Sequence, residues 1–160
     1  MSHPIATTLT PDLIHFLRTF RNSPPRVHIF YGIGDNGKTT FVNILRTMFK
    51  VISINRWNQA VEALVAQEKP DLLVCSEVRP SDLFSLVNNV KNCGHHVIVE
   101  AATISFALMK ESVVTTYRFS KQFGRGTNDH PKLDPDQVVN EAGAAFLWEL
   151  INKKDAVDTA

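Results

Sequence analysis

Cysteine, long hydrophobic runs and charge of one sign are all scarce in this sequence, and each shortage excludes a class of protein. The two cysteines, Cys75 and Cys93, form no CxxC pair, so we expect reduced thiols in a reducing compartment rather than a disulfide framework. The apolar runs are too short to cross a bilayer, and residues 1–10 lack the features of a secretory signal peptide. We therefore expect an intracellular protein without a membrane partner.

Positive and negative charges nearly cancel. The chain has 17 Lys and Arg against 16 Asp and Glu, a net charge of +1. This balance excludes a strongly basic nucleic-acid binder by bulk charge, although it permits a local basic patch. With 160 residues, of which 44% are hydrophobic, the chain is long enough for one domain with a buried core.

One stretch carries a specific motif. Residues 32–40 read Gly-Ile-Gly-Asp-Asn-Gly-Lys-Thr-Thr and fit G-x-x-x-x-G-K-[ST], the Walker A phosphate-binding loop. The run Val-His-Ile-Phe-Tyr at 27–31 precedes it and predicts a buried strand. Apolar residues then recur at helical spacing over 41–48. The predicted order of strand, loop and helix is the context that the motif requires.

The motif predicts a site for ATP and Mg²⁺. Lys38 would reach the β- and γ-phosphates, and the Thr39 hydroxyl would ligate Mg²⁺. Glycines allow backbone N–H groups to face the phosphates, and the helix beginning near Lys38 adds the positive end of its dipole. The predicted nucleotide-binding residues are Gly32, Ile33, Gly34, Asp35, Asn36, Gly37, Lys38, Thr39 and Thr40. A glycine turn without a ligand is the alternative.

Strand and helix signals alternate along the rest of the chain. Strands are predicted at 27–31, 51–54, 71–77, 96–100 and 113–119. Helices are predicted from Pro11, capped by Thr10, and at 38–50, 56–67, 80–94 and 106–109, with a last one capped by Asp134-Pro135. This order predicts an α/β fold, a P-loop NTPase three-layer sandwich whose mainly parallel five-stranded sheet carries helices on both faces. We divide the chain into an N-terminal helix (1–25), the P-loop domain (26–152) and a tail (153–160).

The spacing of apolar residues also predicts which face of two helices is buried. Trp57, Ala60, Val61 and Leu64 share one side of the 56–67 helix, and Val139, Ala142, Phe146 and Leu150 share one side of the last helix. We expect both of these sides to face the core.

Two carboxylates stand at predicted strand ends, where a parallel sheet places its ligands. Glu77 closes an apolar strand as a Walker B acid does, and it would polarise water and hold the metal together with Thr39. Glu100 closes the next strand and would sense the γ-phosphate or pair with Lys38. The alternative for both is a solvated strand end. His95 and His96 precede a strand at its amino end and have no zinc-ligand spacing.

These residues resemble the ATPase domain of superfamily 3 helicases, most closely the branch of the poxvirus primase-helicase. The similarity rests on Gly-x-Gly-x-Asn-Gly-Lys-Thr-Thr at 32–40, and in pattern and spacing it extends over about residues 26–152. The strand ending in Ser76-Glu77 resembles the Walker B strand of the family, and Val97 to Glu100 lies where the family has its motif C strand. The final helix, with Trp148, looks like the helix that closes the family's domain.

The resemblance implies a ring of identical subunits, or part of a larger replication protein, that acts on single-stranded DNA or RNA in viral or mobile-element replication. The location would then be the host cytoplasm or nucleus. Arg79 and Lys91 are the basic residues of the segment that would contact nucleic acid, and ordinary solvated charges are the alternative. The family's motif C strand ends in Asn, whereas Glu100 stands here. Arg118 is the only arginine just before Phe119, so either Arg118 serves as the trans-acting arginine or that arginine is absent.

Two other functions remain open from the sequence. A small nucleoside or nucleotide kinase shares the Gly-Lys-Thr-Thr ending, but it needs an arginine-rich lid and an acceptor signature. The nearest sequences to these are Gly124-Arg125-Gly126 and Asn55-Arg56. A catalytically degenerate P-loop fold that acts as a structural or interaction module would explain the missing Asn and the lone arginine.

Overall fold

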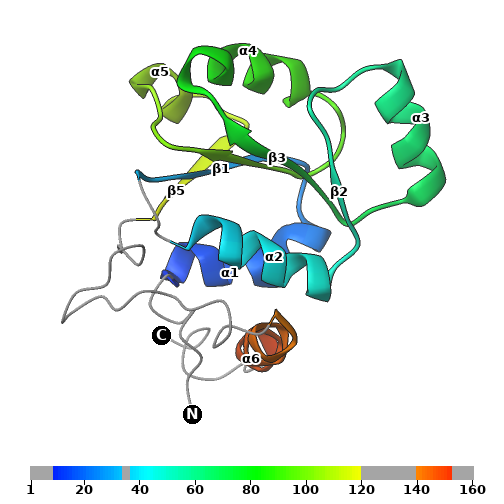
Figure 1. The fold of residues 1–160 in the computed structure, drawn as a ribbon, viewed down its shortest axis with the longest axis vertical. Coiled ribbons are helices and arrows are strands. Elements are labelled where there is room, and N and C mark those ends of the chain that lie inside the picture. The colour runs from blue at the N-terminus through cyan, green and yellow to red at the C-terminus, as the bar shows by residue number, and fades with distance from the viewer. Residues whose placement is uncertain (1–8, 34–36, 120–139, 153–160) are drawn as a thin grey trace.

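The computed structural model describes residues 9–33, 37–119 and 140–152, and it contains a five-stranded sheet between helices (Figure 1). The strands are β1 (Val27–Tyr31), β2 (Val51–Ser53), β3 (Leu72–Val78), β4 (Val97–Ala101) and β5 (Val114–Arg118). They lie in the order β2-β3-β4-β1-β5, and every pair is parallel. The predicted α/β three-layer fold is confirmed.

Helices cover both faces of this sheet. They are α1 (Pro11–Thr19), extended by the 3-10 turn η2 (Phe20–Asn22), α2 (Lys38–Met48), α3 (Gln59–Glu68), α4 (Pro80–Val90), α5 (Phe106–Met109) and α6 (Asn140–Asn152). Figure 1 shows α4 and α5 above the sheet and α1, α2 and α6 below it, with α3 beside the edge strand β2. Among the described helices, none has the length and apolar character that crossing a bilayer requires.

Side-chain caps explain where two of the helices begin. Thr10 accepts a hydrogen bond from the Leu13 N–H at 3.3 Å, with Pro11 in the first turn, as predicted. The prediction for α3 was wrong by three residues, because the helix begins at Gln59 rather than Arg56. The Asn58 side chain accepts the Val61 N–H at 2.9 Å and so fixes the later start.

The predicted buried face of α3 is only partly confirmed, since Trp57 and Val61 pack against the core as expected but Ala60 and Leu64 do not. Val65 is buried, whereas Leu64 is 44% exposed and Ala60 lies at the surface. The short edge strand β2 offers little surface for this helix to cover. Only a narrow stripe of α3 therefore reaches the core.

The predicted buried face of α6 needs a similar correction. Ala144 and Leu147 are buried, Ala142 is exposed, Phe146 and Leu150 are only half-buried, and Val139 lies outside the described residues. The rotation of α6 follows from its docking. Arg18 of α1 donates to the carbonyl oxygens of Leu150 at 2.8 Å and Ile151 at 3.2 Å, which places a cation at the carboxyl end of the helix.

A chain of buried polar side chains crosses the amino ends of the strands. His28 Nδ1 lies 3.1 Å from the Tyr117 hydroxyl, His28 Nε2 lies 2.9 Å from His96 Nδ1, and His96 Nε2 lies 3.1 Å from the Ser23 carbonyl oxygen. Since a carbonyl only accepts, His96 Nε2 donates, and neutral rings then give one direction throughout: Tyr117 to His28, His28 to His96, His96 to Ser23. His96 is thus a buried residue with a partner at each ring nitrogen.

Burial keeps both rings of this chain neutral. It lowers the pKa of His28 to about 3, with smaller contributions from the charges of His96 and Arg26. Burial also lowers the pKa of His96, although its hydrogen bond to Ser23 acts in the opposite direction. It raises the pKa of Tyr117 to about 12, so the phenol remains a donor.

We therefore expect the protein to lose stability in mild acid. Below the ordinary histidine pKa of about 6.5, His28 and His96 bind protons more readily in the unfolded chain than in the folded one. The free energy of unfolding therefore falls by about 1.4 kcal/mol per pH unit for each proton that only the unfolded chain binds. Urea denaturation between pH 7.5 and 5 measures this slope. His96→Gln should flatten it; a slope equal to that of the wild type would contradict this explanation.

Candidate functional site

The predicted phosphate loop, residues 32–40, begins where β1 leaves the sheet. The Gly32 N–H donates to the carbonyl oxygens of both Ala101, at 3.3 Å, and Ala102, at 3.2 Å, which ties the start of the loop to the end of β4. Gly32, Ile33 and Gly37 to Thr40 are described, whereas the predicted ligands Gly34, Asp35 and Asn36 lie outside the described residues.

The end of the loop is a glycine at the start of a helix. Gly37 has φ +89°, the left-handed region that glycine adopts without strain, and it is the N-cap of α2. Because glycine carries no side-chain oxygen, it leaves the first N–H groups of α2 without a cap of its own. Lys38 donates from Nζ to the Gly32 carbonyl oxygen, so its ammonium group lies across the loop between its two ends.

Glu100 lies directly beside this loop. It sits on β4, next to Phe30 of β1 in register, and is only 4% exposed. The Thr39 hydroxyl donates to Glu100 Oε1 at 3.3 Å. The structure therefore brings together two predicted site residues, Thr39 and Glu100. The carboxylate of Glu100 accepts its hydrogen bond from the hydroxyl that was predicted to ligate the metal.

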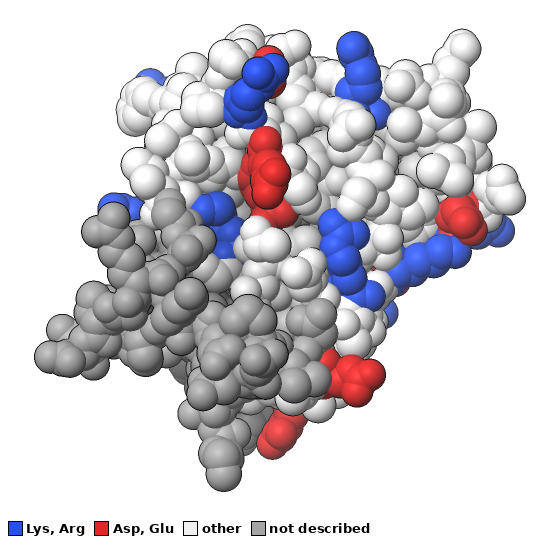
Figure 2. Space-filling view, in the orientation of Figure 1, with Lys and Arg blue, Asp and Glu red and all other residues white. Residues whose placement is uncertain are grey.

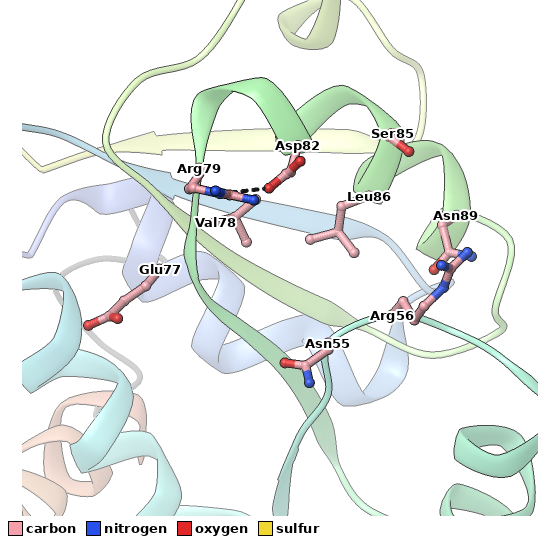
Figure 3. A pocket seen from close by; sticks show the side chains of 9 residues that line it. All are labelled: Asn55, Arg56, Glu77, Val78, Arg79, Asp82, Ser85, Leu86 and Asn89. Atoms are coloured by element: carbon pink, nitrogen blue, oxygen red, sulfur yellow. Dashed lines mark hydrogen bonds and ion pairs between the residues drawn. The ribbon is translucent and has the colours of Figure 1, made fainter.

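Glu77 reaches the same side of the sheet by a distortion of β3. The pairing of β3 with β4 shifts register between Cys75 and Val78, and Glu77 has φ +53°. In a regular strand Glu77 would share the side of Cys75, which packs in the same core cluster as α4. The bulge instead turns Glu77 away from α4, toward the side on which α2 lies (Figure 3).

A polar cavity of about 310 Å³ opens beside Glu77, between the loop after β2 and α4 (Figure 3). It is lined by Asn55, Arg56, Glu77, Val78, Arg79, Asp82, Ser85, Leu86 and Asn89. Asn89 connects α4 to the loop after β2, because its side chain accepts a hydrogen bond from the Trp57 N–H at 2.6 Å and donates one to the Trp57 carbonyl oxygen at 3.1 Å. Asn89 was not among the residues predicted from the sequence, where its only signal was an amide between the apolar positions of α4.

Arg118 lies on the other side of β1. It closes β5, next to Tyr31 in register, and is exposed. Because β5 and β4 flank β1 on opposite sides, the structure does not group Arg118 with Glu77. Arg118 instead lines a second cavity, which also touches Gly32 and Ile33 of the loop.

The two cations expected to contact nucleic acid each face a carboxylate. Arg79 Nε lies 3.0 Å from Asp82, and Lys91 Nζ lies 4.0 Å from Glu111. Figure 2 shows basic and acidic side chains interspersed over the described part of the face in view. The Arg79–Asp82 pair is exposed and therefore weak, so Arg79 could exchange its partner for a phosphate, whereas the Lys91–Glu111 pair is half-buried.

The site fits Mg²⁺ only as an ion shared with phosphates. Within residues 9–33, 37–119 and 140–152, no group of three or more His, Cys, Asp and Glu side chains gathers as metal ligands. Thr39 and one carboxylate, Glu100 or Glu77, would supply the protein ligands, and phosphate oxygens and water the rest. Mg²⁺ is commonly held at phosphates in this way.

Known proteins give no independent indication of function: the sequence matches no model of a protein family and no curated protein.

The backbone of Glu77 leads to a test of strain at the site. A non-glycine residue in the left-handed region costs about 1–2 kcal/mol of folding free energy. Substitution by glycine removes this cost, but it also raises the conformational entropy of the unfolded chain, which offsets part of the gain. Glu77→Gly should therefore raise the free energy of unfolding by about 0.5–1 kcal/mol in urea denaturation. Lys69, at φ +51°, is the matched control, and Lys69→Gly should stabilise similarly. Destabilisation by Glu77→Gly alone would show that its side chain supports the fold.

Proposed function

We propose that this chain is a P-loop ATPase domain of the helicase type, which binds ATP with Mg²⁺ at residues 32–40 and hydrolyses it. The contact of the Thr39 hydroxyl with the buried Glu100 is the observation that carries the proposal. A carboxylate buried beside a glycine-capped helix N-terminus gives anion-binding N–H groups and a metal ligand at one edge. A glycine turn that only reverses the chain does not require a buried carboxylate beside the start of the next helix.

Each residue at this edge has a separate role in the proposal. Lys38 binds the β- and γ-phosphates, and the backbone N–H groups at the start of α2 donate hydrogen bonds to the phosphate oxygens. Mg²⁺, when bound, neutralises charge that develops on the phosphates. Glu100 orients the Thr39 hydroxyl for the metal, and Glu77, exposed at the same edge, accepts a proton from the attacking water.

The nucleic-acid part of the proposal rests on the resemblance to superfamily 3 helicases. In that proposal the chain acts on single-stranded DNA or RNA in viral or mobile-element replication, as a homo-oligomeric ring or within a larger replication protein. Arg118 is exposed at the same edge of the sheet, where a neighbouring subunit can approach it. Contacts of Lys and Arg with phosphates release counterions, so binding of nucleic acid should weaken as the salt concentration rises, and a net charge of +1 adds little attraction from bulk charge.

ATP turnover with Mg²⁺, with and without single-stranded DNA at low salt, tests the proposal. Lys38→Ala removes the cation of the loop, so we expect nucleotide affinity to fall about ten- to hundred-fold and turnover to disappear. Turnover that DNA does not stimulate would remove the helicase part. Binding that depends on Lys38 without turnover would support a degenerate module, and affinity unchanged in Lys38→Ala would refute the site.

Glutamine substitutions separate the two carboxylates. Glu77→Gln should slow hydrolysis about a hundred-fold or more while ATP affinity stays the same, because it removes the base and keeps the shape. Glu100→Gln should weaken the dependence of binding on Mg²⁺ concentration, since it removes the charge beside Thr39. Titrating Mg²⁺ at fixed ATP distinguishes them, and identical behaviour of the two variants would contradict the assignment.

A small-molecule kinase is the second candidate, and the cavity beside Glu77 favours it. Asn55 and Arg56, the nearest match to an acceptor signature, line this cavity together with Glu77. An acceptor hydroxyl held there could give its proton to Glu77 and take the γ-phosphoryl group from ATP. Chromatography of the products decides: phosphorylated nucleosides or nucleotides indicate the kinase, and inorganic phosphate alone indicates the ATPase.

A further inference from the structure

A second cavity, of about 380 Å³, opens at the carboxyl ends of β4, β1 and β5. It is lined by Tyr31, Gly32, Ile33, Ala102, Thr103, Ile104, Arg118 and Phe119. Gly32 and Ile33 belong to the phosphate loop, so a molecule whose phosphates occupy that loop has this cavity as a direct neighbour.

Backbone hydrogen bonds fix the walls of this cavity. The Gly32 N–H bonds the end of β4 through Ala101 and Ala102, and the Phe119 N–H donates to the Tyr31 carbonyl oxygen at 2.8 Å. Phe119 is buried, and its ring lies 5.2 Å from that of Phe30. Backbone hydrogen bonds therefore hold the ends of β4, β1 and β5 to one another where they line the cavity.

The lining has the chemistry that a nucleobase requires. Tyr31 and Arg118 lie next to each other in register on adjacent strands, and an aromatic ring and a guanidinium plane are the two surfaces on which bases stack. Ile33 and Ile104 add apolar walls, and the Thr103 hydroxyl can donate and accept at the edge of a base. Mostly apolar walls with a few polar groups are typical of small-molecule sites.

We propose that this cavity holds the base of the nucleoside triphosphate, with Tyr31 as its stacking surface. The inference rests on the proposed function, because the phosphates in the loop deliver the base to the cavity. It assigns the base to the β5 side of β1, opposite the carboxylates Glu77 and Glu100. The polar cavity beside Glu77 is then left for water or an acceptor.

The test compares ATP with inorganic tripolyphosphate, which carries the phosphates without the base. Calorimetric titration with each ligand and Mg²⁺ is done on the wild type, Tyr31→Leu and Tyr31→Phe. Base–aromatic stacking contributes about 1–3 kcal/mol, so Tyr31→Leu should lower the affinity for ATP about five- to hundred-fold and leave the affinity for tripolyphosphate unchanged. Tyr31→Phe should retain both affinities. Phe84→Leu, which shortens an exposed aromatic side chain on α4, is the matched control and should change neither.

Each outcome separates this inference from the proposed function. Lys38→Ala should lower the affinity for both ATP and tripolyphosphate, because it acts on the phosphate site, which the two ligands share. Ala102→Leu, which fills the cavity from an exposed position, should weaken ATP only and replaces Tyr31→Leu if that variant fails to fold. Unchanged ATP affinity in a folded cavity variant, or equal weakening of both ligands, overturns the base site while the ATPase proposal stands. A wild type that binds neither ligand overturns both.

Discussion

A buried carboxylate bonded to a threonine hydroxyl organises the carboxyl edge of this sheet. Glu100 is almost fully buried because β4 lies between β1 and β3, with helices on both faces of the sheet. A charge in such a position is tolerated only when polar partners replace the water it has lost. Thr39 provides one, and it does so from the first turn of the helix that the phosphate loop caps. The placement of β4 therefore couples the loop to the sheet.

A second carboxylate reaches this edge at the expense of regular backbone geometry. The register shift in β3 and the left-handed backbone of Glu77 cost free energy that a regular strand would not. Bulges of this kind often re-aim a side chain next to a site. Here the effect is to bring Glu77 to the side of Glu100, so that two carboxylates from adjacent strands face the helix that begins at Lys38.

Local signals in the sequence predicted the elements, whereas tertiary pairing decided the site. Strand, glycine loop and helix could be read from 27–48, because capping and periodicity are short-range properties. Glu77 was predicted as the leading acid because it closes an apolar strand as a Walker B acid does. The strand order, which depends on contacts between distant segments, could not be predicted in the same way, and it places Glu100 on the strand next to β1 and Glu77 one strand further away. The misassigned faces of α3 and α6 have the same origin, since docking partners set helix rotation.

The two ends of the sheet use buried polar groups in different ways. At the amino end, Tyr117, His28 and His96 form a one-directional chain in which each donor meets an acceptor, so it is complete without a ligand. At the carboxyl end, the bond from Thr39 uses one of about four lone-pair sites that a carboxylate offers. In the proposed function an ion or phosphate would add to that edge without displacing the bond from Thr39. The polar side chains at the amino end thus pair with one another, whereas the carboxylate beside the predicted phosphate loop offers more acceptor sites than this bond uses.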